Sequence, residues 1–144
     1  MIDGMAGRSP TTRHQRTRAD HATEIAEDYC EAIAELGDDA DGCRVTDLAS
    51  RFGVSRVTVV RTVKRLERDG LVVTTPRRPV RLTEDGRRLA AACRRRHEIV
   101  YRFLLSIGVD PRVAATDAEG IEHHVSPSTL NRFRELADRH PGGS

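Results

Sequence analysis

The sequence predicts a mainly α-helical protein, in which a winged helix-turn-helix domain is followed by an all-helical domain. Three observations support this fold class. Residues 46–70 have the pattern of a helix, a glycine turn and a longer helix, which is typical of a helix-turn-helix. Two short β-branched runs follow, as the strands of a wing would. The chain after the wing is helical in pattern, and 144 residues suffice for two small halves that share a core.

Composition excludes several classes of protein. Charged residues make up 32% of the chain. No apolar run approaches the roughly 18 residues of a membrane span, and no signal-peptide pattern opens the sequence. The three cysteines are odd in number and irregularly spaced, which excludes a disulfide scaffold and a four-cysteine zinc site. We therefore expect a cytoplasmic protein without a membrane partner.

The net charge of +2 conceals a strong segregation of charge along the chain. Residues 20–41 carry nine acids and no Lys or Arg, whereas residues 42–102 have a net charge of +10. Such asymmetry indicates cation binding in one part and nucleic-acid binding in another. All basic residues but Lys64 are Arg, which suits phosphate recognition, although a GC-rich genome produces the same bias.

The N-terminal region divides into an arm, a helix and a loop. Residues 1–20 combine glycines and four Arg without an apolar period, so we expect a disordered basic arm, either touching DNA phosphates or without function. Apolar residues recur at spacings of three and four from His21 to Leu36, which predicts a helix that stops at Gly37. Residues 38–42 have loop composition.

Capping residues set the expected bounds of the helix-turn-helix and its wing. Thr46 caps a helix that runs to Phe52, and Ser55 caps a second helix that ends at Gly70. The wing then comprises strands over 71–75 and 80–82, joined by the turn Pro76-Arg77-Arg78-Pro79.

Three further helices complete the prediction. Thr83 to Gly86 begin a long helix that continues to about Ile107. Pro111 and Pro127 are each expected to begin a helix. Proline is favoured at this position because the backbone N–H that it lacks would have no hydrogen-bond partner in the first turn. These two helices are expected to reach His124 and Arg139.

The second helix of the helix-turn-helix should read DNA. A recognition helix presents its first turns to the major groove and its flanks to phosphates. This surface carries Ser55, Arg56, Thr58, Arg61, Thr62 and Lys64. Arg56 and Arg61 are the candidates for guanine contacts. Phosphate contacts, or simple exposure to solvent, are expected for Lys64, Arg65 and Arg68, and the wing adds Arg77, Arg78 and Arg81. The sequence thus predicts a double-stranded DNA operator as partner; a winged helix used for protein contacts is the alternative.

Metal-ligand side chains gather at helical spacing in two places. Asp28 and Glu31 lie three residues apart on one helix, and Glu119, Glu122 and His123 share a face of another. Taken singly, the acids fit solvated helix faces and His97 fits an ordinary histidine of the long helix. Glu119, Glu122 and His123 together favour a metal site, because three side chains that can ligate a metal share one face of a helix.

Four segments resemble, in order and spacing, the manganese transport regulator branch of the diphtheria-toxin-repressor family. They are Asp28-Tyr29-Cys30-Glu31, Arg96-His97-Glu98-Ile99, residues 103–109 and residues 117–126, the last with the highly specific run Glu-Gly-Ile-Glu-His-His-Val-Ser. The resemblance covers about residues 21–140. It implies a homodimeric repressor with a DNA-binding domain over 21–83, a metal-binding and dimerisation domain over 84–144 and no SH3-like third domain. It also implies the ligands Asp28, Glu31, His97, Glu119, Glu122 and His123.

The chemistry of this set agrees with manganese. Four carboxylates and two imidazoles are hard donors that suit Mn(II), and four negative charges match two divalent ions per protomer. Iron-responsive members resemble this chain but carry Met and Cys at the positions of Asp28 and Glu119. Fe(II), Co(II) or Zn(II) are expected substitutes, since the intrinsic affinity order does not favour manganese.

We therefore expect a manganese(II)-responsive repressor of manganese-uptake genes, whose metal orders the dimer for operator binding. One alternative is a winged-helix regulator that responds chiefly to Fe(II) or holds a purely structural metal. Another is a binuclear metallohydrolase, but no nucleophile or oxyanion motif accompanies the cluster. Two departures from the family lie in the DNA-reading part: Arg56-Val57 where a proline is usual, and Arg77-Arg78-Pro79 where Arg-Gly is usual.

Overall fold

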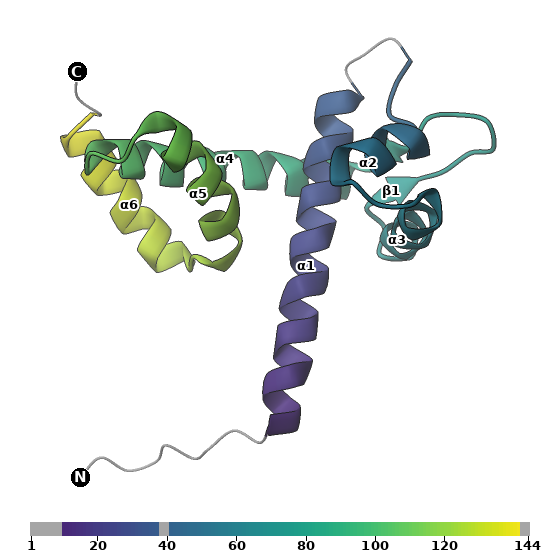
Figure 1. Cartoon of the computed structure of the whole chain (residues 1–144), viewed down its shortest axis with the longest axis horizontal. Helices are drawn as coiled ribbons and strands as arrows, with labels where there is room; N and C mark the ends of the chain where they lie inside the picture. Colours follow the sequence, from purple (N-terminus) through teal and green to yellow (C-terminus); the bar gives the residue numbers. More distant parts are fainter. Residues whose placement is uncertain (1–9, 38–40, 142–144) are drawn as a thin grey trace.

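The structure, a computed structural model, describes residues 10–37 and 41–141. Its elements are α1 (Pro10–Leu36), α2 (Val45–Phe52), α3 (Arg56–Arg68), β1 (Val72–Val73), β2 (Arg81–Leu82), α4 (Glu84–Ser106), α5 (Pro111–Ile121), the 3-10 helix η1 (Glu122–His124) and α6 (Pro127–Arg139). The predicted fold class, a winged helix-turn-helix followed by a helical domain, is confirmed. Figure 1 shows α4 joining the two parts and α1 crossing it between them.

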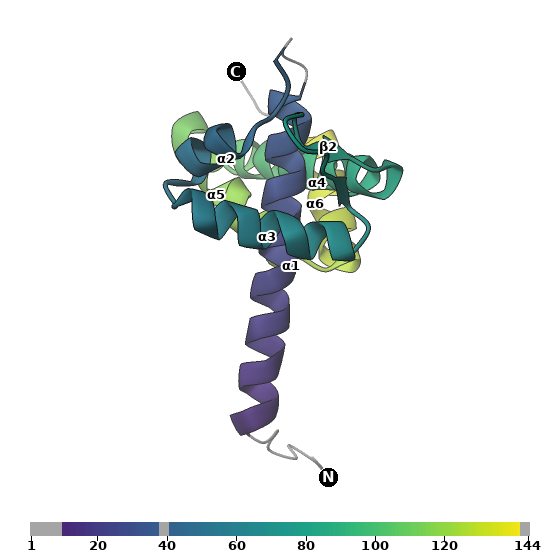
Figure 2. The same cartoon turned by 90° about the vertical axis from the view of Figure 1, so that its right-hand side faces the viewer.

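Helix α1 begins earlier than expected. The prediction of a disordered arm over residues 1–20 is wrong for residues 10–20, which are helical, whereas residues 1–9 lie outside the described part. Pro10 is the first helical residue, and neither Gly nor Pro interrupts the eleven positions that follow it. Extending a formed helix adds a hydrogen bond without a new nucleation cost, so no apolar face is needed. Figure 2 shows these turns projecting away from the body.

The helix-turn-helix is fixed by caps. Ser55 Oγ accepts the N–H of Thr58 at 3.1 Å, as expected of an N-cap. Thr46 is not the cap of α2. Arg44 occupies that position, because the Asp47 carboxylate accepts its backbone N–H at 2.9 Å and starts the helix two residues earlier. Gly53 adopts the left-handed conformation, with a φ of 63°, and so allows the tight turn between α2 and α3.

The wing is a short antiparallel hairpin. Val72 pairs with Leu82 and Val73 with Arg81, so the two strands are shorter than the predicted ranges 71–75 and 80–82. An isolated bridge continues the pairing on the other side, where the Val80 N–H donates to the Cys43 carbonyl at 2.8 Å. The wing is therefore anchored to the segment that precedes α2.

Two apolar cores lie on either side of the α1–α4 crossing. The first joins α1, α2, α3, the wing and the start of α4, with Leu48, Val59 and Leu66 fully buried. The second joins the end of α4 to α5 and α6 and is centred on Val100 and Ala114. Within the described residues, no helix is both long and apolar enough to cross a membrane.

Candidate metal centre and DNA-binding surface

A cavity of about 680 Å³ lies where α1 meets α4, α5 and η1. Its lining includes all six predicted ligand residues, which come from three regions of the chain: Asp28, Glu31, His97, Glu119, Glu122 and His123. Glu24 and Glu35 of α1 add two more acids to the wall, and α2 contributes Arg51 and Phe52. The fold thus gathers an acidic cluster beside the helix-turn-helix.

His123 is the best-defined side chain of this cavity. Its Nε2 lies 3.0 Å from Asp28 Oδ1, and its Nδ1 lies 2.6 Å from Glu27 Oε2. Burial alone lowers the pKa of His123, but the hydrogen bond that it donates to Glu27 and the charges of Asp28 and Glu122 raise this pKa above its usual value. When Nδ1 donates to Glu27, Nε2 keeps a lone pair and can ligate a metal beside Asp28.

Glu122 is a buried acid without enough partners. The residue is 2% exposed, and its Oε2 has no hydrogen-bond partner among the described residues. The closest charged atoms are Arg96 Nε and His123 Nε2, each 3.9 Å from a carboxylate oxygen. Burial raises the pKa of Glu122 to about 7. Because an unpaired buried carboxylate is costly, this side chain fits a site completed by a cation.

The acids of α1 repel one another at the same place. Burial, followed by the charge of Glu24, raises the pKa of Asp28, although His123 opposes this shift. Burial and the charge of Glu35 likewise raise the pKa of Glu31. One ligand atom from each of Glu24, Asp28 and His123 lies within 4.8 Å of the others, a spacing that a shared ion can span.

The two remaining predicted ligands are less constrained. Glu119 lines the cavity but is exposed, and within the described residues it has no ion pair. His97 lies parallel to Tyr101, with 6.4 Å between ring centroids, and its charge acts on Glu31. Both side chains therefore have room to move toward an ion.

The predicted single helix from Pro111 to His124 is wrong at its end. Helix α5 stops at Ile121, and residues 122–124 form η1. Gly120 weakens the helix just before this point. The tighter turn changes the direction of the side chains, so that Glu122 and His123 are turned inward while Glu119 stays exposed.

Three residues of the centre were not predicted as site residues: Glu24, Glu27 and Arg96. Glu27 Oε2 accepts from both His123 and Arg96, whose Nη2 lies 2.7 Å away. This contact joins α1, α4 and η1 through one carboxylate oxygen. The sequence did contain a signal for the two acids, because four acids lie close to one face of the same helix: Glu24, Glu27, Asp28 and Glu31.

The cavity is also connected directly to the helix-turn-helix. Arg51 of α2 forms an ion pair with Glu35 of α1, one turn beyond Glu31. The ring of Phe52 stacks on Tyr29 with centroids 4.5 Å apart. Helices α1 and α2 are therefore in direct contact beside the cavity.

The predicted DNA-reading residues lie on the surface of α3 and the wing. Those that are exposed are Ser55, Arg56, Thr58, Arg61, Lys64, Arg77 and Arg78. Thr62 is half-buried, and its hydroxyl donates to the Thr58 carbonyl at 3.0 Å. The hydroxyls of Ser55 and Thr58 are 3.0 Å apart within the cap, so the charged side chains are the free groups of this surface.

Arg65 differs from its neighbours on α3. It is half-buried, and its Nη2 is buried without a hydrogen-bond partner among the described residues, so its expected phosphate contact stays a prediction. A groove of about 570 Å³ runs along α3 between Arg61, Lys64, Glu67 and Arg68.

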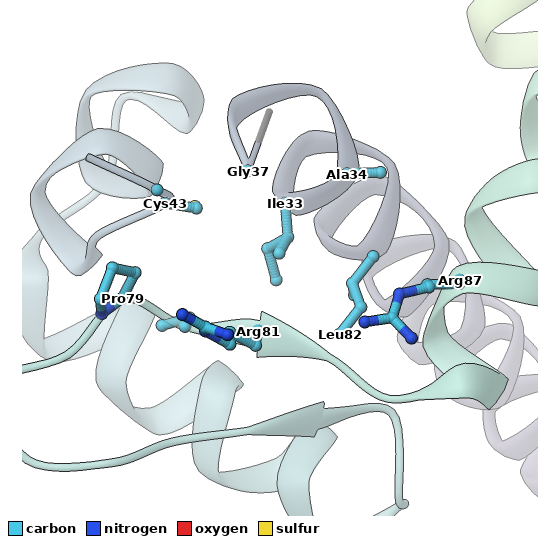
Figure 3. A pocket seen from close by; sticks show the side chains of 10 residues that line it. Ile33, Ala34, Gly37, Cys43, Pro79, Arg81, Leu82 and Arg87 are labelled. Atoms are coloured by element: carbon cyan, nitrogen blue, oxygen red, sulfur yellow. The ribbon is translucent and has the colours of Figure 1, made fainter. Parts of the chain in front are cut away.

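A separate cavity of about 500 Å³ contains none of the predicted ligands. Figure 3 shows Ile33 of α1 and Leu82 of β2 approaching this space, with Arg81 and Arg87 as its charged side chains. Burial raises the pKa of the neighbouring Cys43 thiol to about 11, so it stays neutral. This lining offers no metal ligand set.

A winged helix with a free basic surface, in contact with a cavity of carboxylate and imidazole donors, defines a metal-dependent DNA-binding regulator. Two family models match the chain: "Iron dependent repressor, N-terminal DNA binding domain" over residues 21–80, and "Iron dependent repressor, metal binding and dimerisation domain" over residues 83–141. The transcriptional regulator MntR of Escherichia coli O6:H1 is 44% identical over 126 residues, which cover 88% of this chain and 81% of that protein. MntR of Bacillus subtilis strain 168 is 34% identical over 114 residues, 79% of this chain and 80% of that protein.

Solved structures of metal-dependent regulators are similar to this chain as well. A manganese-dependent transcriptional repressor in complex with manganese superposes with a TM-score of 0.69 at 32% identity, over 78% of this chain and 52% of that one. ScaR with bound Zn²⁺ gives a TM-score of 0.68 at 27% identity, over 78% and 53%. The chain thus spans about half of these solved chains. It belongs to the diphtheria-toxin-repressor family of iron-dependent repressors, in the MntR branch, whose members are transcriptional regulators rather than enzymes.

Proposed function

We propose that this protein is a cytoplasmic, homodimeric repressor of manganese-uptake genes that binds its operator when loaded with Mn(II). The proposed ligands are Asp28, Glu31, His97, Glu119, Glu122 and His123, which suffice for two ions per protomer. The observation that carries this proposal is the convergence of these side chains on one cavity, where Glu122 has an unpartnered carboxylate oxygen.

The donor set favours manganese over softer metals. Carboxylates and imidazoles are the ligands of hard divalent ions, and no cysteine lines the cavity. Burial raises the pKa of the Cys30 and Cys93 thiols to about 11 and about 12, so neither is a thiolate near neutral pH. A solved relative holds manganese, but others hold Zn²⁺ or Cd²⁺, so the ranking of metals must be measured on this chain.

The positions of the acids explain how metal binding would control operator binding. A bound divalent cation would supply the positive charge that the cluster lacks. Without that charge, Asp28 and Glu31 of α1 repel the other acids, while Glu27 contacts α4 through Arg96 and η1 through His123. Holding α1 fixes α2 through Arg51 and Phe52. The two recognition helices of a dimer are then spaced for successive major grooves. Coupling of this kind is typically worth about 1–3 kcal/mol.

A metal-dependent DNA-binding titration tests the proposal. The duplex is selected from a random library by the full chain in the presence of mixed divalent ions. Its affinity is then measured after chelation and with Mn²⁺, anaerobic Fe²⁺, Co²⁺ or Zn²⁺. We expect Mn²⁺ to raise affinity by about 5- to 150-fold. Glu122→Gln should abolish this rise, whereas Glu98→Gln, at an exposed acid of α4, should preserve it.

The alternatives predict different results. Equal affinity with and without metal would leave only a structural role for the ion. A larger rise with Fe²⁺ than with Mn²⁺ would assign the protein to iron sensing. Loss of the response in Glu98→Gln would remove the cavity from the explanation.

A further inference from the structure

Three arginines from three different elements face one pocket beside the recognition helix. The pocket has a volume of about 290 Å³ and is lined by Arg44, Arg56 and Arg78, together with Val45, Thr46 and Val80. Arg44 precedes α2, Arg56 is the first residue of α3, and Arg78 lies in the wing. No acid belongs to this lining.

The backbone fixes these arginines near one another. The bridge between Cys43 and Val80 sets the residue before Arg44 against the end of the wing turn. The approach is close, because a Cβ added at Gly42 would lie 2.6 Å from the Cβ of Pro79. Within the turn, the Arg78 N–H donates to the Thr75 carbonyl at 3.0 Å. The grouping is therefore a feature of the folded backbone and does not depend on chance side-chain positions.

The charge of the pocket is not compensated. Among the described residues, Arg44, Arg56 and Arg78 have no ion pair, whereas Arg51 and Arg96 are each paired with an acid. The carboxylate of Asp47, in the first turn of α2, accepts the Arg44 backbone N–H and does not line the pocket. The first residues of α2 do line it, so the positive end of that helix adds to the same field.

We propose that this pocket binds one phosphate of the operator backbone. An exposed cluster of guanidinium groups at a helix N-terminus matches a phosphate, which each guanidinium can contact through paired N–H donors. Arg56 is then a phosphate anchor rather than a guanine reader, and Arg61, one and a half turns further along α3, is the arginine left to read a base. The pocket clamps one strand between wing and recognition helix, which sets the register of α3 in the groove. This inference rests on the proposed operator binding.

The experiment compares Arg→Gln variants at these positions with Arg61→Gln and with the remote control Arg132→Gln on α6. Affinities of the manganese-loaded full chain are measured for the selected duplex and for random duplex over a range of salt concentrations. Each pocket variant should lose about ten-fold on both duplexes. The triple variant should lower the salt slope by about one, because three arginines share one phosphate. Arg61→Gln should reduce the preference for the selected duplex, and Arg132→Gln should change neither quantity.

A second measurement locates the phosphate. Single methylphosphonate substitutions along the duplex should include one position per half-site that weakens the wild type but leaves the triple variant unaffected. A base-specific loss in Arg56→Gln, or unchanged affinity in Arg44→Gln and Arg78→Gln, would overturn the phosphate pocket. Failure of the wild type to bind any duplex with Mn²⁺ would instead overturn the proposed function. Circular dichroism of each variant excludes misfolding as the cause of a loss.

Discussion

Glu27 contacts the proposed ligand His123 but is not itself one of the proposed ligands. One oxygen of this carboxylate accepts from His123 Nδ1 and from Arg96 Nη2. Glu27→Gln keeps an oxygen acceptor but removes the charge that stabilises this arrangement. We expect a 10- to 100-fold weaker affinity for Mn²⁺, the usual loss when a group orienting a histidine ligand is altered. Isothermal titration calorimetry measures this affinity.

The metal-free protein provides an independent measurement for the same variant. The hydrogen bond to Glu27 raises the pKa of His123, so Glu27→Gln should lower that pKa in an NMR titration without metal. The matched control is Glu98→Gln, which should alter neither the affinity nor the pKa. An unchanged His123 titration in Glu27→Gln would show that the contact is absent in solution.

Residue type reveals a ligand more readily than it reveals the partner of a ligand. Asp28, Glu31 and His123 were expected as ligands because the family resemblance implies them, and their chemistry agrees with a cation. In the sequence, Glu27 cannot be told from an acid on a solvated helix face, because its residue type and spacing are the same. Only the packing of α4 and η1 over α1, which leaves Glu27 8% exposed, reveals its position in the cluster.

At the scale of the element, two helical glycines with opposite surroundings give a matched pair of substitutions. A Cβ on Gly86 in the first turn of α4 would lie 2.1 Å from the Leu71 carbonyl oxygen, whereas one on Gly120 in α5 meets nothing within 4 Å. Gly86→Ala should therefore cost about 2 kcal/mol or more by overpacking. Gly120→Ala should add up to about 1 kcal/mol of stability through helix propensity. Urea unfolding of the metal-free protein measures both, and equal effects would contradict the packing of α4 against the wing.

The elements differ in how far their bounds followed from the sequence. Helices α3, α4 and α6 were predicted within one or two residues, because Ser55, residues 83–86 and Pro127 are clear start signals. In the structure, the side chains of Ser55, Thr83 and Ser126 accept the local hydrogen bonds of the three N-caps. The start of α1 was missed because a helix that projects from the body needs no apolar period. The end of α5 was missed because Gly120 alone is a weak stop signal, and the contacts of Glu122 and His123 form only in the folded protein.

For the whole molecule, α1 separates two surfaces of opposite charge. Figure 1 shows α5 and α6 on one side of α1 and α3 on the other. The acids of α1 line the cavity on the first side, and the free arginines of α3 and the wing lie on the second. The net charge of +2 thus conceals an acidic cavity and a basic surface on opposite sides of one helix.

The stability of the metal-free molecule should depend on pH through this acidic cluster. Burial raises the folded-state pKa of Glu122 to about 7 from an ordinary value of 4.5, and it also raises the pKa of Asp28 and Glu31. A raised pKa contributes stability that is complete below the unfolded-state value and is lost as the pH rises through the folded-state value. His123 has a raised pKa as well and acts in the same direction. The free energy of unfolding should therefore fall by about 2 kcal/mol between pH 5 and pH 7.5.

Manganese should reverse this dependence, because metal ligands bind only when deprotonated and the ion then stabilises the folded state. Thermal unfolding followed by circular dichroism, at pH 5 and pH 7.5 with chelator or with excess Mn²⁺, measures both effects. The melting temperature should fall with pH in chelator, and the increase caused by Mn²⁺ should be larger at pH 7.5. Glu122→Gln, which cannot ionise, should flatten the chelator profile and reduce the response to Mn²⁺. A wild-type melting temperature that rises with pH in chelator would mean that burial does not raise the pKa of Glu122 in the free protein, and it would contradict the buried, unpartnered carboxylate.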